Sequence, residues 1–171
     1  MPGIALYDAS IGNLINGTVA LRDILKKASE SSDASSFPQA RIHADMQPLT
    51  FQVKIAALMA QKTINELTGG DVELTQGKDT MDEMIALCEK NIELLRKVDA
   101  KSLEGKETET LSVKLGAQPN PVELTGQQFV LGYVLPNLFF HVTTAYDILR
   151  MKGVPLGKKN YLDPFMSAVK K

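Results

Sequence analysis

Apolar residues recur at alternating steps of three and four along several stretches of this chain, a spacing that places them on one face of an α-helix. The first stretch covers residues 8–30, and its stripe contains Ile11, Leu14, Ile15, Thr18, Leu21, Leu25 and Ala28. A serine-rich polar run and Pro38 follow, which predicts a loop over residues 31–44. The chain is therefore expected to begin with an amphipathic helix that packs against further helices.

A second helix is expected over residues 48–68, ended by the glycine pair at 69–70. Pro48 suits a first helical turn because its missing N–H costs nothing there, and Asp45 can accept hydrogen bonds from the free amides of that turn. On a helical wheel, Gln52 falls inside the apolar arc, whereas the polar residues on the opposite side are Lys54, Gln61, Asn65 and Thr68. The wheel thus predicts one buried amide on this helix.

A third helix begins with a capping box, Thr80-Met-Asp-Glu83, in which the threonine hydroxyl and the glutamate carboxylate bond to each other's free amides. Its stripe runs to about Val98 and contains Met84, Cys88, Asn91, Ile92 and Leu95. Cys88 is the only cysteine, so no internal disulfide can form. We interpret it as a small core residue rather than a reactive thiol.

The pattern changes to alternation between residues 108 and 125, which predicts a short β-hairpin. A second capping box, Thr125-Gly-Gln-Gln128, then opens the longest apolar segment, which ends at Met151-Lys152 before Gly153. Pro136 lies inside this fourth helix and is expected to kink it or loosen the turn before it. A weak last helical segment is expected over residues 164–169.

Length and composition indicate one folded domain over residues 1–171. Nineteen basic and twenty acidic side chains give a net charge of −1, which does not favour nucleic-acid or membrane-surface partners. No stretch reaches the roughly 18 apolar residues that a membrane span needs, and the first residues lack the pattern of a signal peptide. A cytoplasmic protein is expected.

The fourth helix carries the candidate functional residues. His141 shares its arc with Val134, Leu138, Ala145 and Ile148, so its imidazole is expected to point at the core. Asn137 lies one turn before it and Thr144 about one turn after, with Tyr133 a little further round. Inward polar groups need partners, and Gln52 on the second helix is a candidate for His141.

Two interpretations of these residues remain open. His141, Asn137 and Gln52 can form a buried polar network that fixes helix register, or they can line a pocket between helices. Amide oxygens are poor substitutes for imidazole or thiolate toward zinc, nickel or copper. His43 could supply a second nitrogen, but it precedes the second helix in a loop and is more simply a solvated side chain.

The stretch LPNLFFHVTTAYDILR at residues 135–150 resembles the C-terminal signature of a domain-of-unknown-function family in the DinB/YfiT-like superfamily. LYDAS at residues 6–10 and DMQPLxxQV at residues 45–53 resemble its other two blocks. The resemblance extends over most of the chain, from about residue 4 to residue 162, so residues 163–171 are expected to form a peripheral tail. It implies a mainly α, DinB-like four-helix bundle, frequently dimeric, here with a small β-hairpin between the third and fourth helices.

The resemblance also indicates which residues of this chain stand at the metal-ligand positions of the superfamily. Better-known members of the superfamily hold a divalent metal with one histidine on the second helix and an HxxxH pair on the fourth, and often transfer low-molecular-weight thiols to electrophiles. His141 matches the last histidine, Asn137 stands where its partner would be, and Gln52 is the likeliest match for the second-helix ligand. No metal cofactor is therefore expected. If zinc or nickel binds, His141, His43 and Asp45 are the candidate ligands.

Three functions are compatible with these residues. The first is an intracellular protein that binds or acts on a small molecule, with His141 as proton donor or acceptor and with Asn137, Gln52, Tyr133 and Thr144 around the ligand. The second is a divalent-metal-dependent transferase of the superfamily type. The third is a non-catalytic dimeric structural or stress-related protein. A homodimer is expected, for which Phe139 and Phe140 offer apolar side chains off the inward arc.

Overall fold

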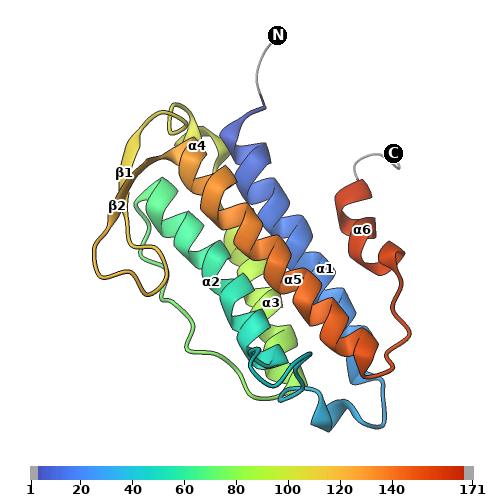
Figure 1. The fold of residues 1–171 in the computed structure, drawn as a ribbon. Helices are drawn as coiled ribbons and strands as arrows, with labels where there is room; N and C mark the ends of the chain where they lie inside the picture. Colours follow the sequence, from blue (N-terminus) through green and yellow to red (C-terminus); the bar gives the residue numbers. More distant parts are fainter. Residues whose placement is uncertain (1–3, 168–171) are drawn as a thin grey trace.

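Four long helices form a bundle in the computed structural model, which describes residues 4–167 (Figure 1). They are α1 (Asn13–Ser29), α2 (Leu49–Thr68), α3 (Met81–Arg96) and α5 (Leu135–Met151). Helices α1 and α5 run in one direction and α2 and α3 in the other (Figure 1). Helix α1 packs against α3 and α5, and α2 packs against the same two helices. The predicted mainly α bundle is confirmed.

The shorter elements lie at the ends and sides of this bundle. They are η1 (Asp8–Gly12), η2 (Ala34–Ser36), η3 (Ala100–Leu103), β1 (Thr110–Val113), β2 (Val122–Thr125), α4 (Gly126–Phe129), η4 (Val130–Val134) and α6 (Lys158–Met166). Strands β1 and β2 pair antiparallel, with Thr110 opposite Thr125 and Val113 opposite Val122, so the expected hairpin is present. No helix among the described residues is long and apolar enough to cross a membrane.

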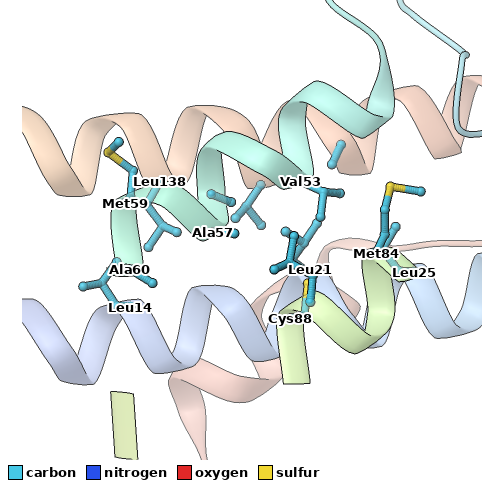
Figure 2. Packing of buried hydrophobic residues seen from close by; sticks show 14 of the residues in the cluster. Leu14, Leu21, Leu25, Val53, Ala57, Met59, Ala60, Met84, Cys88 and Leu138 are labelled. Carbon is cyan, nitrogen blue, oxygen red and sulfur yellow. The ribbon is translucent and has the colours of Figure 1, made fainter. Parts of the chain in front are cut away.

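The core is built from the apolar stripes of the four long helices. Figure 2 shows side chains of α1, α2, α3 and α5 directed toward one another, among them Leu21, Ala57, Cys88 and Leu138. Small residues of α2, such as Ala57 and Ala60, lie among larger side chains of the neighbouring helices, as close packing of helices requires (Figure 2). Cys88 is buried in this cluster, as expected.

Both predicted capping boxes are confirmed, but the predicted cap of α2 is wrong. Asp45 makes no capping bond; instead its carboxylate pairs with His43, in the loop before the helix. The amide N–H of Leu49 donates to the Ala40 carbonyl at 2.9 Å, and that of Thr50 donates to the Pro38 carbonyl at 3.2 Å. Because the preceding loop folds back over the helix start, its carbonyls take the bonds that a side-chain cap would provide.

The turn before Pro136 is loosened as expected. Residues Val130–Val134 form a π-helical turn, and the amide N–H of Leu135 donates to the carbonyl of Val130, five residues back. Proline has no N–H to continue the α-helical ladder, and its ring clashes with the carbonyl four residues back in a regular helix. The wider turn accommodates both consequences, so α4, η4 and α5 continue as one long helical segment.

The last helix was placed wrongly by the sequence pattern. Helix α6 begins at Lys158 rather than at residue 164, and residues 168–169 of the predicted segment lie outside the described part. The side chain of Asn160 accepts from the Gly157 N–H at 2.9 Å, which caps the helix start. The helix packs on α1, and Phe165 meets Phe139 of α5 edge to face at 6.0 Å between ring centroids. Phe139 is therefore occupied within the chain.

The helical wheel of α2 also misplaced one residue. Gln61, expected on the polar side, is buried, because the segment 69–80 runs back along the bundle from the end of α2 to the start of α3 (Figure 1). Asn65 bonds to both the N–H and the carbonyl of Val72, at 2.7 and 2.8 Å. Gln61 accepts from the Thr75 N–H at 2.9 Å. Two amide side chains of α2 thus hold this segment against the helix.

Candidate functional site

His141 lies on the inward face of α5, as its wheel position predicts. Val134, Leu138, Ala145 and Ile148 on the same arc are fully buried, and His141 itself is 9% exposed. Its ring nitrogen Nδ1 lies 2.7 Å from Oε1 of Gln52 on α2. The predicted partnership between these two residues is therefore present, and it joins the two helices across the bundle.

The bonds of Gln52 determine which nitrogen of His141 carries the proton. The side-chain Nε2 of Gln52 donates to the carbonyl of Gln47 at 2.9 Å, so the amide is oriented with its oxygen toward the imidazole. An amide oxygen only accepts hydrogen bonds, and therefore Nδ1 of His141 must donate. In the neutral ring the remaining nitrogen, Nε2, then carries an unprotonated lone pair.

The surroundings of His141 keep the ring neutral. Burial lowers the pKa of His141 to about 4, because the charged form loses hydration in this environment. Phe51 and Phe140 approach the imidazole edge to face, with centroid separations of 6.1 and 5.2 Å. Among the described residues, nothing bonds to Nε2 of His141. At neutral pH this atom is a hydrogen-bond acceptor.

The ring borders a cavity of about 380 Å³ between α2, α5 and the end of the hairpin. The residues that line it are Phe51, Ile55, Leu58, Met59, Lys62, Leu74, Lys114, Gly116, Tyr133, Asn137 and His141. Gln52 does not line the cavity, but its hydrogen bond to Nδ1 positions the His141 ring. About half of the wall is aliphatic or aromatic, and its polar side chains come from α5 (Asn137 and His141), η4 (Tyr133), α2 (Lys62) and the hairpin connection (Lys114).

The other predicted site residues have local partners. Asn137 donates from Nδ2 to the Tyr133 carbonyl at 2.7 Å, and the Tyr133 hydroxyl accepts from the Gly116 N–H at 3.2 Å. Both residues line the cavity. The Thr144 hydroxyl donates to the Phe140 carbonyl at 2.7 Å, and Thr144 is not on the cavity wall. The structure therefore brings Tyr133, Asn137 and His141 together and leaves Thr144 outside.

The residues present do not fit the three-histidine metal site of the superfamily. The Gln52 oxygen is already used as the acceptor for Nδ1 of His141, so it is not available as a metal ligand. His43 and Asp45 are exposed, pair with each other and do not line the cavity. Within residues 4–167 no three His, Cys, Asp or Glu side chains come together as a metal-binding group. One imidazole with neutral amides is a weak donor set for zinc or nickel.

Cys88 plays no part in this site. The thiol is fully buried in the core, and burial raises its pKa to about 12. The thiolate, which is the nucleophilic and metal-binding form, is therefore negligible at neutral pH. This agrees with the interpretation of Cys88 as a packing residue.

Sequence reasoning missed several wall residues. Phe51 sits next to Gln52 on α2, and Lys62 follows on the same helix, so their positions beside the inward amide were available in the pattern. Lys114 and Gly116 come from the hairpin connection, and Leu74 comes from the segment 69–80. No periodic signal places such loop residues over a helix pair.

Comparisons with known proteins agree with this architecture. Residues 6–162 match the family described as Domain of unknown function (DUF1993), so the chain belongs to that family. A crystal structure of a DinB family member protein from Shewanella denitrificans is similar, with 28% sequence identity and a TM-score of 0.78. The similarity covers 92% of this chain and 91% of that chain. No curated protein matches the sequence. The fold is DinB-like.

Proposed function

We propose that this protein binds a small molecule in the cavity beside His141. The observation that carries the proposal is the fixed tautomer of His141, whose Nδ1 donates to Gln52 while Nε2 borders the cavity without a partner among the described residues. A purely structural network would use both nitrogens or bury the second one. A partner for Nε2 must come from a ligand or from water.

The cavity wall indicates what kind of ligand fits. Neutral His141 accepts a hydrogen bond at Nε2, so the ligand presents an O–H or N–H group there. The Tyr133 hydroxyl already accepts from Gly116, which leaves its own proton available to donate. Phe51, Ile55 and Leu58 provide the apolar surface for the rest of the molecule. These features favour an amphipathic ligand with one polar end.

The charged residues at the cavity favour a ligand of negative charge. Lys62 forms an ion pair with Glu66 at 3.0 Å, whereas Lys114 has no ion-pair partner among the described residues. If the protein is an enzyme, His141 acts as a general base, because a ring with a pKa of about 4 is unprotonated at neutral pH. Asn137 and Tyr133 then orient the group that loses its proton.

The test is a ligand screen monitored by thermal unfolding, with wild type and His141→Ala side by side. A ligand of this cavity at 100 times its Kd should stabilise the wild type by about 2.7 kcal/mol and leave the variant unchanged. Small acids with an apolar body are the first compounds to screen. Ligands that stabilise both proteins equally, or a complete absence of hits, would reject the proposal in favour of a non-catalytic structural role.

We also propose that the protein carries no resident transition metal. Protein purified without chelator or a nickel column should contain well under one equivalent of zinc or nickel per chain, because the donor set is weak. Elemental analysis checks this. One equivalent of metal that disappears in His141→Ala would instead support the metal-dependent transferase.

For assembly we propose a homodimer. Phe140 on α5 is 58% exposed, which is a large apolar side chain to leave in water. Light scattering at micromolar concentration should give a mass above the 18.7 kDa of one chain. A monomer at all concentrations would contradict this proposal.

A further inference from the structure

A second cavity, of about 400 Å³, lies between α3 and the segment 69–80. Its wall is made by Gln61, Glu73, Leu74, Thr75, Gln76, Gly77, Lys78, Glu83, Ala86, Leu87 and Lys90. Leu74 is the single residue that borders both this cavity and the one beside His141. The second cavity has its own polar groups, and nothing in the proposed function uses them.

Gln61 is the fixed polar group of this cavity. The residue is 1% exposed, and its Oε1 accepts from the Thr75 N–H at 2.9 Å. That bond sets the orientation of the amide and leaves the Nε2 group without a partner among the described residues. Because Gln61 lies on the cavity wall, this donor is available to an oxygen acceptor in the cavity. An N–H donor at this position suits a carboxylate oxygen.

The charged residues around Gln61 come from different elements and are not neutralised by one another. Lys90 belongs to α3 and Glu73 to the segment 69–80, and neither forms an ion pair in the described part of the chain. Glu83 is occupied, because its carboxylate accepts from the N–H groups of Asp79 and Thr80 and from the Thr80 hydroxyl. A positive and a negative group thus remain available at one cavity.

We propose that this cavity binds the head group of a small zwitterion, such as an amino acid or a dipeptide. The carboxylate accepts from Nε2 of Gln61 and faces Lys90, and the ammonium group faces Glu73. An apolar side chain of the ligand contacts Leu74 and Leu87. A phosphate group fits less well, because Glu73 and Glu83 would repel a second negative charge.

An NMR titration of the full-length, ¹⁵N-labelled protein tests the proposal with L-leucine as the probe. We expect leucine to shift the side-chain amide signals of Gln61 and the backbone amide signal of Thr75. N-acetyl-leucine, which lacks the ammonium group, should bind more weakly, and leucinamide and inorganic phosphate should cause no shift. No shift with millimolar leucine, or equal shifts with phosphate, would overturn the proposal.

Variants separate this site from the cavity beside His141. Lys90→Gln should weaken leucine binding about two- to fivefold, whereas Lys97→Gln, an exposed lysine at the end of the same helix, should not change it. Equal affinities for the two variants would count against the proposal. Leucine should still bind to His141→Ala. If His141→Ala lost leucine binding, leucine would bind in the first cavity and the second site would be rejected. This conclusion does not depend on the result of the ligand screen for the first cavity.

Discussion

Two buried glutamines on α2, Gln52 and Gln61, differ in how many of their side-chain polar atoms form hydrogen bonds. They are nine residues apart, which places them on opposite sides of the helix, and they are 2% and 1% exposed. Gln52 uses both ends of its amide, with Oε1 on His141 and Nε2 on the Gln47 carbonyl. Gln61 uses only its oxygen, on the Thr75 N–H.

The difference lies in which atoms still lack a partner. Both polar atoms of the Gln52 side chain have hydrogen-bond partners. Because Gln52 bonds to Nδ1 of His141, the atom that remains without a partner is Nε2 of His141, a residue that borders the first cavity. Gln61 keeps its own donor at the second cavity. Burial alone therefore does not identify a functional polar residue. A donor or acceptor that is unpaired and also borders a cavity is the one that a ligand can use.

Gln52→Leu should give the largest loss of stability. A leucine at this position removes two bonds at once and places methyl groups against Nδ1 of His141 and the Gln47 carbonyl, so water cannot replace the amide. We expect the free energy of unfolding to fall by about 1 to 3 kcal/mol, measured by chemical denaturation. A loss no larger than that of Gln61→Leu would remove the distinction between the two glutamines.

The pH dependence of stability should reveal the neutral ring of His141. Its pKa of about 4 in the folded protein lies below the unfolded value near 6.5, so in this interval the unfolded chain binds a proton that the folded protein does not. The stabilisation is present above pH 6.5 and is lost as the pH falls toward 4. Because water reaches the cavity side of the ring, we expect about 1 to 2 kcal/mol.

The measurement compares denaturation at pH 7 and pH 4.5 for wild type and His141→Gln. Other titrating groups contribute equally to the pH dependence of both proteins. The difference between the two losses of stability therefore reports the contribution of His141. A variant that loses as much stability on acidification as the wild type would show that the ring is not buried as described.

His141→Ala should have a smaller effect on stability than Gln52→Leu, although it removes the same hydrogen bond. The alanine opens the wall of the cavity, and water can then reach Oε1 of Gln52. We expect a loss below about 1 kcal/mol, together with complete loss of ligand stabilisation. A large loss of stability with ligand binding intact would make His141 a structural residue.

Gln61→Leu should change global stability by no more than about 0.5 kcal/mol, because Thr75 is only half-buried and its amide can turn to water. The local effect should be clear. Hydrogen exchange at the Thr75 amide should become faster, while exchange at the buried amides of α5 stays the same. Unchanged protection of Thr75 would mean that Asn65 alone holds the segment.

The part of the site that follows helix periodicity could be predicted from the sequence. The arc of α5 that carries His141 and the arc of α2 that carries Gln52 both follow from the 100° step, and their meeting follows from bundle packing. The capping boxes at Thr80 and Thr125 were predictable because their bonds span only three residues.

The errors arise where distant chain segments meet. Gln61 looked solvated because the wheel cannot include the segment that covers it, which is held by Asn65 from the same helix. Asp45 looked like a cap because it stands just before Pro48, a local signal that cannot include the carbonyls of Ala40 and Pro38, which bond to the helix start instead. Cavity residues contributed by loops, such as Lys114, carry no periodic signal for the same reason.

The π-helical turn at Val130–Val134 sets the orientation of the hairpin relative to the helix that follows it. Such a turn contains one residue more than an α-helical turn, so deletion of Leu131 would force an α-helical turn beside Pro136 and rotate everything before it by about 100° around α5. Gly116 would then no longer reach the Tyr133 hydroxyl, which it now meets at 3.2 Å. A one-residue deletion here would therefore remove a wall of the His141 cavity without altering any residue that lines it.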